Sequence, residues 1–230
     1  MASAQTQLIE GLNALDAGLI LLTAFGMVAT RQVQGVMRFF IVQSVFLAIS
    51  AFLIGFNRGS IHLIALGVIT IGAKAVAIPL VLKRTLPDDL YERREINQVI
   101  NIPSSLLLAL LLAIAAEFLV GPLVSASTDP VVHVNLPIGL AGILIGAYSL
   151  VARREAIPQL VGILAMENGA FFAGVAIAPD LPLIAELAIA IDVILIAVVI
   201  GVLTRDITRT VGTTEAATMS ELKEEPYIWR

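Results

Sequence analysis

Cysteine is absent from this chain of 230 residues, and charge is scarce. Without cysteine, the chain has no disulfides, no thiolate metal sites and no iron–sulfur ligands of its own. Only 14% of the residues are charged, whereas 58% are hydrophobic and the mean hydropathy is +0.96. A soluble domain of this size cannot hide so much apolar surface, so the composition predicts a polytopic membrane protein. The net charge of −4 gives no sign of nucleic-acid binding.

Several functional signatures are missing as well. Residues 1–16 contain neither Lys nor Arg, so they lack the basic region of a cleavable signal peptide. The chain has no GxGxxG motif, no Walker loop and no nucleophile–base pair, and its two separated histidines do not suggest a metal site. We therefore expect no bond-making chemistry and no metal site in this chain.

Long hydrophobic runs dominate what remains. Windows of about twenty apolar residues predict an all-α bundle of about seven transmembrane helices. The expected spans lie near 11–30, 36–56, 61–82, 103–125, 137–152, 157–178 and 183–204. The fifth is the shortest, and its start is the least defined.

The basic residues give an independent test of this arrangement. With an outside N-terminus, twelve of the fourteen Lys and Arg residues lie inside, Arg58 lies outside and Lys74 lies within the third span. Such a bias follows the positive-inside rule, and six or eight spans would break it. The predicted topology is N-out and C-in.

The chain divides into four predicted parts. Residues 1–86 form a three-helix unit, 87–136 an inside loop and the fourth helix, 137–204 a second three-helix unit, and 205–230 a cytoplasmic tail. The two triplets run in the same directions and carry polar residues at similar places, Gln43 and Glu167 in the second helices and Lys74 and Asp192 in the third. This pattern suggests a parallel duplication. The loop and the tail either contact a soluble partner or are simply solvated.

Glu167 and Asp192 lie near the middle of two hydrophobic runs. A charge at that depth costs about 2.5–3.5 kcal/mol on insertion scales, so such residues by default mark a proton or ion path. Asp192 is too short to reach the membrane surface. Beside Glu167, Asn168 can hydrogen-bond a neighbour and Gly169 lets another helix approach closely. The alternative is a permanently neutral Glu167 that serves only helix packing.

Lys74 is the cation within a predicted span. A buried Lys either loses its proton or pairs with a carboxylate. Pro79 cannot bond the carbonyl of Ala75, so we expect a local break in the helix next to Lys74, which is a common feature of ion paths. A structural ion pair with a kink that only shapes packing is the alternative.

Three further carboxylates lie toward the outside. Glu186 either begins a proton relay or is an ordinary membrane-edge residue in contact with water. Asp16 and Glu117 lie in the outer thirds of the first and fourth spans, and we expect both at the membrane interface.

Three segments carry a resemblance to a known family. They are Leu164-Ala-Met-Glu-Asn-Gly169, Ala185-Glu-Leu-Ala-Ile-Ala-Ile-Asp192 and Gly72-Ala-Lys-Ala-Val-Ala-Ile-Pro79. Together with Gly212-Thr213 and Leu222-Lys223, they resemble the E component of membrane-bound NiFe hydrogenases of the formate-hydrogenlyase type, over nearly the whole chain. The resemblance implies a prokaryotic inner-membrane protein.

The last three spans further resemble the K subunit of respiratory complex I and its homologue in multisubunit cation/proton antiporters. By that likeness, Glu167 matches the carboxylate of the middle K-subunit helix. Asp192 matches a Glu of the last helix, and the substitution of Asp for Glu is a departure, because its side chain is shorter by one methylene group.

The resemblance implies a subunit without a cofactor, embedded in the lipid bilayer. Its expected partners are antiporter-like membrane subunits and peripheral hydrogenase-like redox subunits. The expected function is a share of the proton path, carried by Glu167, Asp192, Lys74, Asn168 and Glu186, in a redox-driven ion-translocating complex. A purely structural membrane anchor and a stand-alone small transporter are the alternatives.

Overall fold

Six long helices stand side by side in the part of the chain that the structure describes. The computed structural model describes residues 2–85, 100–154, 156–177, 194 and 201. Its elements are α1 (Ala2–Ala29), α2 (Val33–Arg58), α3 (Ile61–Thr70), the π-helix η1 (Ile71–Ala77), α4 (Ile78–Thr85), α5 (Ile102–Ala126), α6 (Pro130–Ala152) and α7 (Ala156–Ile177). Because α3, η1 and α4 follow one another without a gap, they form one continuous rod.

Each of these six rods is long and apolar enough to cross a membrane. A helix such as α2, with 26 residues, is about 39 Å long, against a hydrocarbon core of about 30 Å. The all-α, multi-pass architecture predicted from the sequence is therefore confirmed, and six of the predicted spans coincide with helices. The seventh, 183–204, falls outside the described residues apart from two isolated positions, as do the loop at 86–99 and the tail from 205.

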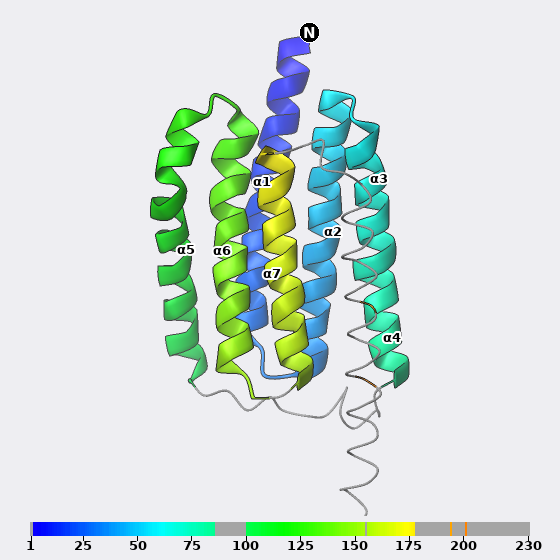
Figure 1. The fold of residues 1–230 in the computed structure, drawn as a ribbon, viewed down its shortest axis with the longest axis vertical. Helices are drawn as coiled ribbons and strands as arrows, with labels where there is room; N and C mark the ends of the chain where they lie inside the picture. The colour runs from blue at the N-terminus through cyan, green and yellow to red at the C-terminus, as the bar shows by residue number, and fades with distance from the viewer. Residues whose placement is uncertain (1, 86–99, 155, 178–193, 195–200, 202–230) are drawn as a thin grey trace, which may run out of the picture.

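Two predicted boundaries were wrong. The fifth span begins at Pro130 rather than near 137, because Asp129 caps the helix with its carboxylate and Pro130 suits the first turn. The polar His133 and Asn135 had lowered the hydropathy of that first stretch. The first helix begins at Ala2 rather than near 11, and its N-terminal end projects beyond the other helices in Figure 1.

Successive rods run in opposite directions along the chain (Figure 1). As a result α1 and α6 run in the same direction, and so do α2 and α7. α5 lies at one edge and α3–α4 at the opposite edge. Between them α6 packs against α7, α1 against α2, and the two hairpins meet through α1 with α6 and α2 with α7. The first helices of the two predicted three-helix units are thus neighbours, and so are the second helices.

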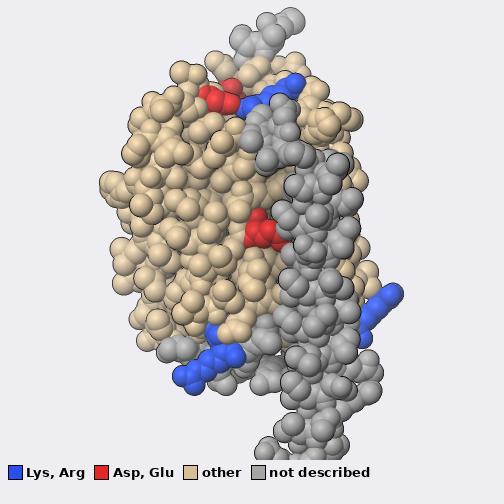
Figure 2. All heavy atoms as spheres, viewed as in Figure 1, with Lys and Arg blue, Asp and Glu red and all other residues tan. Residues whose placement is uncertain are grey.

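Charge is confined mostly to the two ends of the bundle. On the face shown in Figure 2, Lys and Arg lie at the ends, and the described surface between them is uncharged apart from an acidic patch near the middle. One end carries Arg31, Lys83, Arg84, Arg153 and Arg154, which is the end assigned to the inside by the positive-inside rule.

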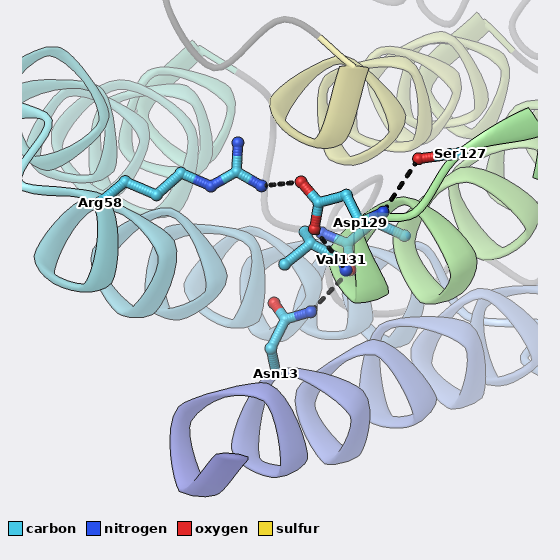
Figure 3. A network of polar contacts seen from close by, with 6 residues as sticks. Asn13, Arg58, Ser127, Asp129 and Val131 are labelled. Carbon is cyan, nitrogen blue, oxygen red and sulfur yellow. Dashed lines mark hydrogen bonds and ion pairs between the residues drawn. The ribbon is translucent and has the colours of Figure 1, made fainter. Parts of the chain in front are cut away.

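The opposite, outer end is held by a small polar network. The α2–α3 turn passes through Gly59 with φ of 65°, a left-handed conformation that glycine adopts without strain. Arg58, at the end of α2, forms an ion pair with Asp129, the residue that caps α6 (Figure 3). Ser127 accepts a hydrogen bond from the Asp129 backbone at 3.2 Å. This network links the end of α2 to the start of α6.

Arg153 has a structural role at the inner end. Its side chain is only 3% exposed and donates a hydrogen bond to the carbonyl of Met27, in the last turn of α1. A cation at a helix C-terminus satisfies a free carbonyl and opposes the helix dipole. The adjacent Arg154 is exposed. Two neighbouring arginines that look equivalent in the sequence therefore differ in function.

We expect Arg153→Gln to lower the free energy of unfolding by about 1.5–3 kcal/mol, the typical loss for a hydrogen bond made by a charged group. Arg154→Gln, the matched control, should change it by less than about 0.5 kcal/mol. Denaturant titration of the purified protein in mixed micelles measures both. Equal losses would contradict the capping role.

Glycines allow α6 and α7 to touch backbone to backbone. A Cβ added to Gly139 would lie 2.6 Å from the Ala173 nitrogen, and one added to Gly169 would lie 2.7 Å from the Gly139 oxygen. A Cβ added to Gly146 would lie 2.7 Å from the Met166 nitrogen, and one added to Gly162 would lie 3.0 Å from the Leu150 nitrogen, so the facing helix is close at these positions too. The predicted close approach at Gly169 is confirmed, and it is a packing mode typical of membrane helices.

Gly139→Ala should therefore destabilise the bundle by about 1–3 kcal/mol, because backbone atoms cannot move aside for the added methyl group. Gly18→Ala in α1, where no atom lies within 4 Å of the added Cβ, is the matched control and should be neutral or stabilising. The melting temperatures of the two variants, measured in the same detergent, test the close packing of α6 on α7. A lower value for Gly18→Ala than for Gly139→Ala would refute it.

Candidate functional site

The centre of the bundle contains an ion pair between Lys74 and Glu167. Lys74 Nζ lies 2.9 Å from Glu167 Oε1, and the two side chains are 2% and 17% exposed. Lys74 lies in η1 and Glu167 in the middle of α7. At 1.5 Å per residue, both lie about 16 Å from the inner ends of their rods, which is mid-membrane depth. Lys74 and Glu167, predicted separately from the sequence, are thus direct partners.

The two charges are not fully saturated by hydrogen bonds. Glu167 Oε2 is buried and has no hydrogen-bond partner among the described residues. The 2.9 Å contact satisfies the distance of an ion pair, although Lys74 Nζ is not in hydrogen-bond geometry with any described group. Lys74 Nζ also lies 5.6 Å from the centre of the Phe171 ring, one turn beyond Glu167, so the ring face adds a cation–π contact.

The backbone around Lys74 departs from the α-helix. Residues Ile71–Ala77 form a π-helix, and the amide of Ile78 bonds the carbonyl of Ala73, five residues back. The ring of Pro79 would clash with the carbonyl of Ala75 in an α-helix, and a wider turn relieves that clash. The predicted break next to Lys74 is confirmed and takes the form of a π turn, a feature frequent at functional sites.

Asn168 continues the polar layer from α7 to α2. Its Nδ2 donates to Gln43 Oε1 at 3.2 Å and to Ser44 Oγ at 3.1 Å, and all three residues are buried. Asn168 Oδ1 and Gln43 Nε2 have no partner among the described residues. Gln43 was noted in the sequence only as the counterpart of Glu167, and the structure brings it into contact with the next residue along α7.

The remaining predicted site residues differ in what the structure says of them. Asp192 and Glu186 lie outside the described residues. Glu117 is exposed on α5. Asp16, expected at the interface in the outer third of the first span, is only 5% exposed and is buried among the helices. Its signal was available in the sequence, since Asn13 and Asp16 are spaced three residues apart and so share a helix face.

Asp16 belongs to the outer half of the bundle, near a second set of buried polar groups. Asn13 Nδ2 donates to Asn135 Oδ1 at 2.7 Å, and Ser50 Oγ donates to Asn13 Oδ1 at 2.6 Å. Sequence reasoning did not single out these residues, because isolated amides and hydroxyls in hydrophobic runs are common. No three potential His, Cys, Asp or Glu metal ligands gather in the part of the chain that is described.

Comparison with known proteins finds distant relatives of this chain. The chain is similar to Hydrogenase-4 component E of Escherichia coli K12, with 28% identity over 65% of this chain and 68% of that protein, and equally to its counterpart in Shigella flexneri. The match is distant, and it supports a relation to the membrane subunits of hydrogenases. The likeness to the complex I K subunit stays a prediction.

A second similarity covers more of the chain. An uncharacterized protein of Mycobacterium tuberculosis is 29% identical over 90% of this chain and 94% of its own length. No protein-family model and no solved structure matches. The six membrane-length helices make this chain a multi-pass membrane protein, and the distant similarity to a hydrogenase component fits a membrane subunit of a hydrogenase-type complex.

If Lys74 and Glu167 stabilise each other, removing both charges should lower the free energy of unfolding by less than the sum of the two single losses. Lys74→Met alone leaves an unpaired carboxylate, and we expect it to lower the free energy of unfolding by about 3–5 kcal/mol. In the double variant with Glu167→Gln, at least half of that loss should be recovered. A double-mutant cycle in mixed micelles measures the coupling, and strictly additive losses would show that the two charges act independently.

Proposed function

We propose that this chain supplies part of the buried proton path of a redox-driven, ion-translocating complex of the membrane-bound hydrogenase type. The ion pair of Lys74 and Glu167 in mid-membrane carries the proposal. Electron transfer in peripheral hydrogenase-like subunits would shift the charge balance near this pair. Protons would then pass toward antiporter-like neighbours, and the chain itself would make or break no covalent bond other than those to protons.

The geometry of the pair suits proton exchange better than permanent fixation. A carboxylate that serves only as a structural counter-ion is normally satisfied at both oxygens, since an unmet buried acceptor is costly. Here one Glu167 oxygen faces Lys74 and the other has no partner in the described part of the chain. Water that reaches this second oxygen can deliver or remove a proton, while Lys74 decides which state of the carboxyl group is favoured.

The π turn adds adaptability at the same place. Its wider winding holds Lys74 beside Pro79, where an α-helical hydrogen bond cannot form. Intramembrane backbone that departs from the α-helix is tolerated where it lies within protein or faces internal water. Asn168 and Gln43 extend the polar layer toward α2, and in this proposal Asp192 and Glu186 continue the path in the last predicted span.

The surface of the bundle favours a subunit over a stand-alone transporter. Only 17% of the most apolar stretch of α5 is buried, and its outer face carries large apolar side chains together with Glu117. The distant similarity to a hydrogenase component points to a multisubunit assembly. A purely structural anchor remains the second candidate, since a mid-membrane ion pair also fixes helix positions.

Glu167→Gln should abolish redox-driven proton translocation in the assembled complex, because the variant keeps the shape of the side chain and removes its titratable proton. Glu167→Asp, which keeps a carboxyl group, should retain part of the activity. Proton uptake is measured in liposomes that contain the complex co-purified with the tagged chain. Glu117→Gln, on the exposed face of α5, is the matched control and should leave translocation unchanged.

Unchanged coupling in an assembled Glu167→Gln complex would favour the structural anchor. If no redox subunit or antiporter-like subunit co-purifies with the tagged chain, the subunit proposal fails. Ion flux catalysed by the purified chain alone would instead identify a transporter.

A further inference from the structure

The outer half of the bundle contains a buried carboxylate that the ion pair does not use. Asp16 is 5% exposed, and its Oδ2 atom has no hydrogen-bond partner among the described residues. One helical turn outward on the same face lies Asn13, which bonds Asn135 of α6 and Ser50 of α2. Asn135 is fully buried, and its Nδ2 atom is likewise without a described partner.

These free atoms are complementary in kind, one an acceptor and the other a donor. Buried polar atoms left unpaired are uncommon, and where they occur in a cluster they are usually met by water. Three helices contribute to this outer cluster, which comprises Asn13 of α1, Ser50 of α2 and Asn135 of α6, and Asp16 lies one turn inward of Asn13. A water molecule that donates to a carboxylate and accepts from an amide is the simplest group that meets both needs.

The rise per residue of a helix gives the height of each polar group between the inner and the outer end of the bundle. Counted from the inner helix ends at 1.5 Å per residue, Glu167 and Ser44 lie at about 16 Å, Asp16 at about 20 Å and Ser50 and Asn135 at about 25 Å. The observed hydrogen bonds join groups of similar height, Ser44 with Asn168 and Ser50 with Asn13, which supports the scale. Asp16 therefore lies between the central pair and the outer cluster.

An apolar layer extends across the height of Asp16, from Ile20 at about 13 Å to Phe172 at about 24 Å on the same scale. Ala17, Ile20, Leu47 and Phe172 form a buried hydrophobic cluster, and the four residues are no more than 2% exposed. Leu47 is the central member, because on α2 it lies one turn outward of Ser44 and one turn inward of Ser50. Among the described helices this layer separates the two polar levels, so water that joins them there must enter it.

We propose that Asp16 is an intermediate proton carrier between Glu167 and the outer surface, and that the layer around Leu47 gates its connection to Glu167. This inference rests on the proposed function of the ion pair and adds the route by which protons reach the outside. When water enters the layer, a proton leaves the Glu167 carboxyl group for the water chain, and the far end of that chain releases one to the Asp16 carboxylate. Asp16 then passes its proton through the water held by Asn13 and Asn135 to the outer end.

Leu47→Ser tests the gate, because a hydroxyl group in the layer admits water. In liposomes that contain the complex co-purified with the tagged chain, a potassium diffusion potential set with valinomycin drives protons without any electron donor. We expect passive proton flux at several times the wild-type rate for Leu47→Ser. The double variant Leu47→Ser/Asp16→Asn should return to the wild-type rate, since the intermediate carrier is then missing.

Leu22→Ser, on the exposed face of α1, is the matched control and should not raise the flux. Flux in Leu47→Ser equal to the wild-type rate overturns the gate, and undiminished flux in the double variant overturns the role of Asp16. Because these measurements need no redox chemistry, they can fail while Glu167→Gln still abolishes coupled translocation. If instead Leu47→Ser raises the flux while Glu167→Gln leaves coupled translocation unchanged, the proposed function fails and the route through Asp16 stands.

Thiol labelling provides a second test that does not depend on the leaky variant. The chain has no cysteine, so single substitutions report without background. We expect Ser50→Cys to react with a small, membrane-impermeant thiol reagent added from outside, and Ser44→Cys not to react. Asn57→Cys, exposed at the outer end of α2, calibrates full reactivity. Equal reactivity at positions 44 and 50, or none at either, would overturn the hydrated outer cluster.

Discussion

The bundle depends on one constraint, which is that a charge in hydrocarbon must find its partner within the protein. Lys74 and Glu167 lie in helices that are distant along the chain, and at mid-membrane depth neither charge is surrounded by bulk water. Their pairing fixes the rotation of η1 and of α7 and sets the height of one against the other. α2 contacts both elements and shares the same polar layer through Gln43 and Ser44. The central helices are thus positioned by electrostatics, and apolar packing fills the space around them.

Polar contacts also set which helices are neighbours. Association in a bilayer gains little from apolar burial, because lipid is as apolar as a leucine side chain, so close packing and hydrogen bonds select the partners. Glycines bring α6 against α7, whereas amides join α1 to α6 and α2 to α7. These amide contacts connect positions 122 to 125 residues apart, which is the spacing between the two predicted three-helix units. A duplicated unit that packs beside its copy would have this arrangement, and the duplication stays a prediction.

The sequence predicts those parts of the structure that a one-dimensional pattern can carry. Apolar run lengths locate the six described spans, and the scarcity of mid-span charge singles out Lys74 and Glu167. Pairing itself was not predictable, because depth along a span does not tell which helices adjoin. Arg153 and Arg154 are indistinguishable as neighbours in the sequence, and only the position of the end of α1 separates a cap from a surface charge. The burial of Asp16 was not predicted, because depth along a span does not tell which side of the helix faces its neighbours.

The π turn also governs which side of the third rod faces its neighbours. Along this rod, every fourth residue from Thr70 is buried, namely Thr70, Lys74, Ile78 and Leu82. In a regular α-helix, steps of four residues drift by about 40° each, so Leu82 would point about 120° away from Thr70, toward lipid. The wider winding across Ile71–Ala77 takes up this drift and keeps the four side chains on one line. A helical wheel drawn at the usual period would therefore assign the inner half of this rod to the wrong environment, and the local winding of the backbone must be known before its lipid-facing side is named.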